Sequence, residues 1–112
     1  MTVNGIYEEI AASCPSSTSA VTLYTYRGTQ EIRDVFLMIT NRGTVNAAAT
    51  VDFLRGGGTP GNEDRALNAF VLRPNSAPFI LPLPHMRRDD AVQVTSSVAS
   101  ALTFKLVGVR RQ

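Results

Sequence analysis

The sequence is poor in the residues that usually carry chemistry or covalent cross-links. It contains no tryptophan, a single histidine (His85) and a single cysteine (Cys14). A lone cysteine excludes a disulfide within the chain, and these two residues fall short of the three or four ligands of a zinc site. A Cys14–His85 nucleophilic pair is formally possible. We favour instead a small apolar cysteine and a solvated histidine, and we predict no catalytic, cofactor-binding or metal-binding residue.

Charge and long apolar runs are also scarce. Only 18% of the 112 residues are charged, against about 25% in soluble domains, which indicates that other subunits cover part of the surface. The 11 basic residues, all arginine except Lys105, are spread along the chain, so we expect no nucleic-acid partner. No apolar run reaches the roughly 18 residues of a membrane span. The first residues lack a basic region and include Glu8 and Glu9, so we expect no signal peptide and folding in a reducing cytoplasm.

Strand signals, in contrast, fill the chain from residue 20 onward. Segments rich in β-branched and aromatic residues alternate with turns of Gly, Pro, Asn and Asp. They cover residues 21–26, 32–40, 47–54, 67–73, 77–83, 92–95 and 102–109. This pattern predicts an all-β fold, with residues 20–112 forming a single β-sandwich or jelly-roll-like domain of about seven antiparallel strands.

Two of these segments have distinctive patterns. Residues 32–40 are apolar on both faces, since Phe36 and Met38 alternate with Val35 and Leu37, which predicts a central, well-covered strand. Residues 77–83 are interrupted by prolines, which cannot donate ladder hydrogen bonds, so this strand should lie at a sheet edge. The aromatic residues at strand spacing could form a stacking platform, but we expect them mainly in the core. They are Tyr24, Tyr26, Phe36 and Phe53.

Residues 1–19 read as an N-terminal arm and linker. Asn4 is placed to cap a short helix over residues 5–13, which would gather Ile6, Tyr7 and Ile10 on one side before Pro15 ends it. The serine-rich residues 16–19 would then link the arm to the body. The pattern leaves open whether the arm docks on its own body or on a neighbour.

Two polar segments resemble chemical sites, one a dinucleotide-binding motif and the other an acid–base pair, but their sequence context argues against both roles. Gly56, Gly58 and Gly61 spell G-x-G-x-x-G, but no helical run follows, so residues 55–66 are predicted to be a loop and not a dinucleotide site. The turn Arg87-Arg88-Asp89-Asp90 is predicted to neutralise its charges locally. Adjacent carboxylates such as these do not make an acid–base pair on a strand.

Short motifs follow one another in a recognisable order across residues 20–110. They are TLYTY at residues 22–26, MITNRG at 38–43, AAATV at 47–51, RGGG at 55–58, DAVQVTSS at 90–97 and LTFKLVGV at 102–109. In this order the chain resembles small structural proteins of bacteriophage particles. The resemblance implies a non-enzymatic virion protein, made in the bacterial cytoplasm, with a β-sandwich body.

Among such proteins, a capsid decoration (cement) protein that stabilises the phage head is the favoured expectation. A tail, baseplate or fibre component is the first alternative, and a carbohydrate- or peptide-binding module is the second. The partners would be the major capsid protein or other virion proteins, with self-association as a trimer favoured and no membrane partner. The expected contact residues are Ile6, Tyr7 and Ile10 of the arm and Arg55, Gly56, Gly57 and Gly58 of the loop.

Overall fold

The computed structural model describes residues 7–57 and 65–110, and these residues form eight strands. They contain no α-helix, and hence none long and apolar enough to cross a membrane. The strands are β1 (Tyr7–Ser13), β2 (Val21–Thr25), β3 (Ile32–Asn41), β4 (Ala47–Leu54), β5 (Arg65–Leu72), β6 (Phe79–Pro82), β7 (Ala91–Ser96) and β8 (Leu102–Arg110). A short 3-10 turn, η1 (Arg55–Gly57), follows β4. All seven strands expected from the sequence are confirmed.

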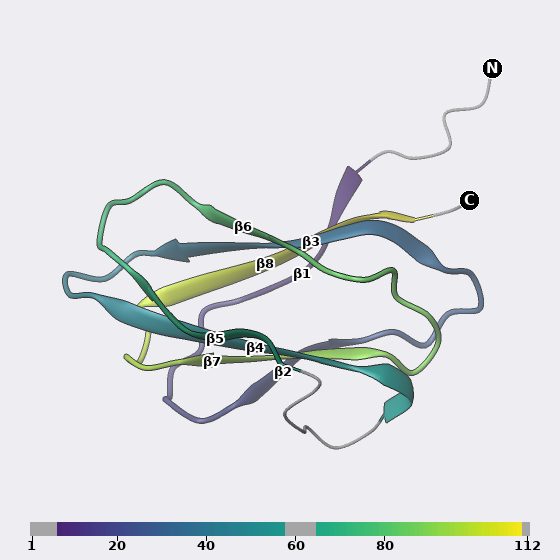
Figure 1. Ribbon diagram of the computed structural model, residues 1–112, viewed down its shortest axis with the longest axis horizontal. Coiled ribbons are helices and arrows are strands. Elements are labelled where there is room, and N and C mark those ends of the chain that lie inside the picture. Colours follow the sequence, from purple (N-terminus) through teal and green to yellow (C-terminus); the bar gives the residue numbers. More distant parts are fainter. Residues whose placement is uncertain (1–6, 58–64, 111–112) are drawn as a thin grey trace.

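The strands form two four-stranded antiparallel sheets that pack face to face (Figure 1). Sheet A, the upper layer in the figure, has the order β1-β8-β3-β6, and sheet B has the order β2-β7-β4-β5. β3 is therefore central and β6 is an edge strand, as their sequence patterns predict.

The pairing of strands follows a single rule. β1 pairs with β8, β2 with β7, β3 with β6 and β4 with β5. This is the pattern produced when one long antiparallel hairpin of eight strands is wrapped into two sheets, and it defines a jelly roll. The predicted all-β sandwich of jelly-roll type is therefore confirmed.

The predicted helix over residues 5–13 is wrong for the part that the structure describes. Tyr7–Ser13 is a strand that pairs antiparallel with β8, from Tyr7 opposite Val109 to Ser13 opposite Phe104. A bulge near Ile10 lets that side chain pack against the core. Pairing with β8 and burial of Ile10 outweigh the local capping signal, because secondary-structure propensity is weak compared with tertiary contacts.

The core lies between the two sheets and follows the two-residue alternation of the strands. Its fully buried side chains include Leu37, Ile39, Val51, Val92, Val94, Phe104 and Leu106. Tyr26 and Phe53 belong to this cluster and Tyr24 packs against it, as expected. Phe36 does not belong to it and lies on the outer side of sheet A.

Asn41 ties the turn between β3 and β4 to the end of β5. Its Nδ2 donates to the carbonyl oxygens of Val45 and Leu72, each at 2.9 Å, and its Oδ1 accepts from the backbone N–H of Gly43 at 2.8 Å. The side chain is buried, so these bonds replace the ones it would make with water. The Asn-Arg-Gly motif thus has a structural explanation within the fold.

Candidate functional site

The predicted contact residues of the arm do not act together. Tyr7 is 56% exposed at the start of β1, and its ring contacts that of Phe36, with 5.7 Å between centroids. Ile10 instead packs against the protein's own core. Ile6 lies outside the described residues. Of the two described residues of this set, Tyr7 presents an apolar surface that another molecule could contact, and Ile10 does not.

The glycine-rich segment after β4 is attached to its own domain. The Nη1 of Arg55 donates to Oδ2 of Asp90 at 2.7 Å and to the carbonyl oxygen of His85 at 3.1 Å. The same guanidinium lies over the ring of Phe53, 5.1 Å from its centroid. Gly57 ends the 3-10 turn, and Gly58 lies outside the described residues. The structure therefore gives Arg55 a role inside the fold, and its predicted contact with a partner stays a prediction.

Asp90 is the centre of this attachment and is only 2% exposed. Besides Arg55, its carboxylate accepts from the backbone N–H of Gly56 at 2.9 Å and of Arg87 at 2.8 Å. Gly56 has a φ of 63°, in the left-handed region that favours glycine. Three donors on a buried carboxylate hold η1 and the segment before β7 together, because each satisfies an oxygen lone pair removed from water.

The charged residues around Asp90 pair across the sequence and not within their own turn. Asp89 Oδ1 contacts Arg27 Nη1 at 2.6 Å, and Glu31 contacts Arg87 at 3.4 Å and His85 at 3.7 Å. The predicted local neutralisation within residues 87–90 is therefore wrong. The turn, with Asp89 at a φ of 70°, directs these side chains toward the segment between β2 and β3.

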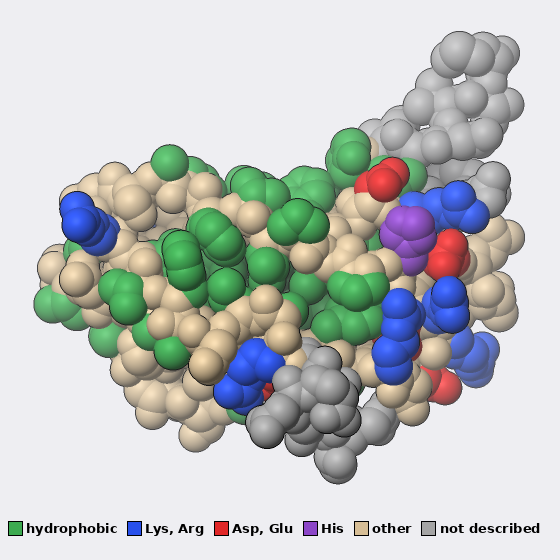
Figure 2. Space-filling model, viewed as in Figure 1, with side chains coloured by type: hydrophobic (Ala, Val, Ile, Leu, Met, Phe, Trp, Pro, Cys, Tyr) green, Lys and Arg blue, Asp and Glu red, His purple; other side chains and the backbone are tan. Residues whose placement is uncertain are grey.

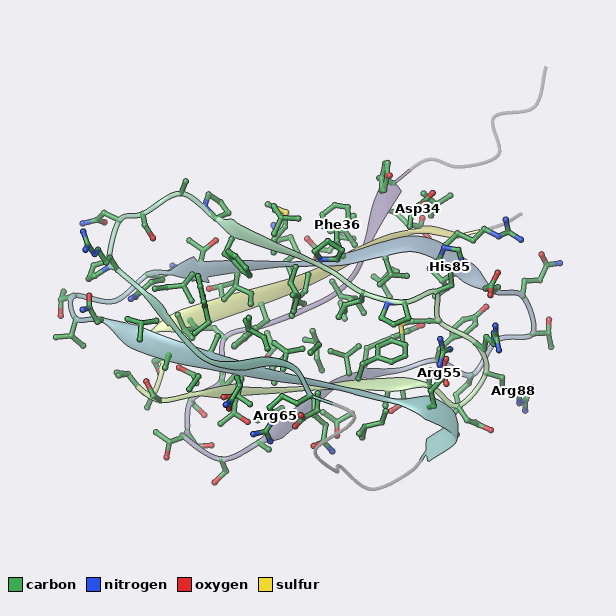
Figure 3. All side chains as sticks on the ribbon, in the orientation of Figure 1. Asp34, Phe36, Arg55, Arg65, His85 and Arg88 are labelled. Atoms are coloured by element: carbon green, nitrogen blue, oxygen red, sulfur yellow. The ribbon has the colours of Figure 1, made fainter. Side chains whose placement is uncertain are left out.

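These charges gather at one end of the sandwich, on the right in Figure 2. Arg55, His85 and Arg88 all lie there (Figure 3). Cys14 lies near the other end, because Pro15 accepts a hydrogen bond from Ser100, just before β8 begins. A Cys14–His85 nucleophilic pair cannot form within one chain. In the described ranges, no group of three or more His, Cys, Asp or Glu side chains could hold a metal ion.

The feature that stands out is an apolar area on the outer side of sheet A, because the core lies on the other side of this sheet. In β3, Phe36 and Met38 alternate with the buried Leu37 and Ile39 and are only partly buried. We call this surface the apolar face. Its residues are Tyr7 of β1, Phe36 and Met38 of β3, Ile80 and Pro82 of β6, and Val107 of β8.

The strand register makes this surface continuous. Phe36 lies between Val107 on one neighbouring strand and Pro82 on the other, and Met38 lies opposite Ile80. Ile80 is 46% exposed, and no described element of the chain covers this side of the sheet. β3 is therefore central and well covered on its inner face, as expected, whereas Phe36 and Met38 on its outer face are only partly buried.

The outer side of sheet B provides a contrast within the same molecule. Its central strands present small or polar residues, and its one buried carboxylate, Asp52, is paired with Arg65 at 3.0 Å. The outward residues of these strands include Ala48 and Thr50 of β4 and Gln93 and Thr95 of β7. Val71, on the edge strand β5, is the exposed apolar exception. The apolar surface is thus a property of sheet A and not of the whole sandwich.

A second apolar area lies at the open side of the sandwich, between the edge strands β5 and β6. The rings of Phe70 and Phe79 stack there with 4.4 Å between centroids and close the gap between the sheets. Figure 2 views this side and shows hydrophobic side chains gathered in its middle, away from the charged end. This area adjoins the apolar face at β6, so the two form one surface around that edge.

Sequence reasoning found Tyr7 and missed the rest of the apolar face. The sequence does carry a sign of this face, because residues 32–40 are apolar on both sides of the strand. That pattern was interpreted as a strand covered by other parts of the same chain. Ile80, Pro82 and Val107 join Phe36 and Met38 only through the register of three strands. No protein-family model and no curated protein sequence matches this chain.

Proposed function

We propose that the chain is a non-enzymatic structural protein of a bacteriophage particle, a capsid decoration protein that docks on the shell through the apolar face. One observation carries the proposal: sheet A has a complete core on its inner side and a second apolar surface on its outer side. Contiguous exposed apolar surface on a small domain is typical of protein–protein contact sites. The partners are the major capsid protein or neighbouring virion proteins.

The jelly-roll strand order is compatible with this proposal but is not sufficient evidence for it. Jelly rolls occur in viral capsid proteins, in lectins and in cupins, and a fold does not determine a function. The apolar face favours the first of these uses. Sugar recognition needs polar groups that pair with hydroxyls, whereas Phe36, Met38 and Ile80 offer none.

Repetition would compensate for the modest size of this face. A small domain placed at symmetry-related positions of a shell gains avidity from linked contacts, so no single contact has to be strong. Self-association as a trimer would provide such linkage, and closed cyclic symmetry is the usual form of a homo-oligomer. The proposed role therefore requires only weak docking by each copy.

The test is the copy number of the chain in purified particles, measured by quantitative mass spectrometry against the most abundant shell protein. A copy number on the order of hundreds is the expected result, since decoration follows shell symmetry. A few to a few dozen copies would replace the head location with a tail, baseplate or fibre location. Absence from the particles would overturn the proposal and favour a carbohydrate- or peptide-binding module.

A further inference from the structure

A hollow of about 290 Å³ lies on the outer side of sheet A, next to the apolar face. Its lining comes from successive outward positions of β3 and β8 and from the turn after β3. The lining residues are Met38, Thr40, Arg42, Thr103 and Lys105. Met38 lies opposite Lys105 and Thr40 opposite Thr103, so the register of the two strands builds the hollow. Met38 belongs both to the hollow and to the apolar face.

The hollow has a net positive charge. Among the described residues, the guanidinium of Arg42 has no ion-pair partner. Lys105 Nζ lies 3.5 Å from Glu9 Oε1, and both of these side chains are about half exposed. Two cations and one neighbouring carboxylate leave one positive charge, which a singly charged anion would balance. A phosphate, with about two negative charges at neutral pH, would exceed it.

Thr103, which lines the hollow, also has a side-chain oxygen without a partner. Thr103 Oγ1 is buried and makes no hydrogen bond with any described residue. A buried polar atom without a partner destabilises the fold, so such groups are rare unless a ligand or water satisfies them. A hydroxyl can donate to a carboxylate oxygen, and the fork of Arg42 can hold both oxygens of the same group.

We propose that this hollow binds the carboxylate of an Asp or Glu side chain from a partner protein, with an apolar neighbour of that residue packing on Met38 and Ile80. The proposal rests on the proposed docking role and adds the chemistry that the partner must present. Phe36, Ile80 and Pro82 lie on the Met38 side of the hollow and offer no polar side-chain group to the hydroxyls of an acidic sugar. A protein segment that combines apolar residues with one acidic residue fits both parts of the surface.

The test uses the full, isotopically labelled chain and two acetylated, amidated peptides. One contains two leucines followed by a glutamate, and the other has glutamine in place of the glutamate. We expect the glutamate peptide to shift the backbone amide signals of Thr40, Arg42, Thr103 and Lys105. The glutamine peptide should bind about tenfold more weakly, because a charged hydrogen-bond partner is lost.

Three variants sharpen the test. Arg42→Gln should weaken binding of the glutamate peptide by about tenfold, whereas Arg88→Gln, the same change at the far end of the sandwich, should leave it unchanged. Thr103→Val removes the unpaired hydroxyl, so it should leave thermal stability equal or higher while weakening binding several-fold. This combination separates loss of a ligand contact from loss of the fold.

Equal binding of the two peptides, or shifts confined to other residues, would overturn the proposal. Tighter binding of glucuronate than of the glutamate peptide at the same residues would also overturn it and assign the hollow to acidic sugars. The copy number in particles is measured independently. A chain that is abundant in particles but binds neither peptide would refute the hollow as a carboxylate site and leave the decoration role standing.

Discussion

The guanidinium of Arg55 lies 2.7 Å from the carboxylate of Asp90, which is otherwise enclosed by the protein. Their positions in the sequence are 35 residues apart. This pair, with the N–H groups of Gly56 and Arg87, fixes the segment that enters β7.

Asp90→Asn should lower the free energy of unfolding by about 2 kcal/mol, since it removes a charged acceptor shared by three donors. The urea midpoint, at unchanged slope, measures this loss. The matched control is Asp89→Asn, whose ion pair with Arg27 is solvent-exposed and should contribute less than about 1 kcal/mol. A larger loss for Asp89 than for Asp90 would contradict the role assigned to the buried carboxylate.

The apolar face should tolerate substitution without loss of the fold. Ile80→Glu and Val71→Glu both replace an exposed apolar residue on an edge strand, one on each sheet. Both should alter stability by less than about 1 kcal/mol, since neither residue belongs to the core. Cosedimentation with particles that lack the chain should show about tenfold weaker binding for Ile80→Glu and none of this loss for Val71→Glu. Equal binding by the two variants would exclude the apolar face from docking.

Gly108 of β8 lies against side chains of both β1 and β3. A Cβ there would lie 2.9 Å from Ile32 Cγ2 and 3.0 Å from Ile10 Cδ1. Gly108→Ala should therefore destabilise the protein by about 1–3 kcal/mol through overpacking. In a double-mutant cycle with Ile10→Ala, the two losses should sum to more than the loss of the double variant, because the smaller side chain makes room. If the two losses in stability were strictly additive, a steric contact between Ile10 of β1 and a side chain at position 108 would be excluded.

Substitutions of Gly56 test the cost of its left-handed backbone conformation and not side-chain packing. Apart from its two chain neighbours, no described residue has an atom within 4 Å of a Cβ added there, but its φ of 63° is in the left-handed region. Gly56→Ala should cost about 1 kcal/mol, and Gly56→Asn should cost less, because asparagine enters this region more readily. Thermal unfolding of the three proteins gives the comparison. Equal stability of the alanine variant and the natural protein would show that the turn relaxes without cost.

The strands were predictable because each carries its own alternation. Prolines identified β6 as an edge, and two-sided apolarity identified β3 as central. β1 was not predictable, since Tyr7–Ser13 becomes a strand by pairing with β8, almost a full chain length away. Only part of the candidate site could be predicted from the sequence, namely that β3 is apolar on both faces. Apolar residues on both faces of β3 indicate cover on both sides, but the pattern is the same whether the chain or a partner provides that cover.

The prolines of the β6 segment also decide how copies of this chain can associate. The N–H of Leu83 donates to Val35 of β3, so by alternation the nitrogens of residues 78, 80, 82 and 84 face the open edge. Three of these four are prolines, and Ile80 alone can donate. A strand from a second copy would therefore find almost no backbone N–H donors along β6. This lack of donors opposes edge-to-edge polymerisation of the chain at high concentration. Growth into a fibre is blocked at the same edge whose side chains remain free to contact another surface.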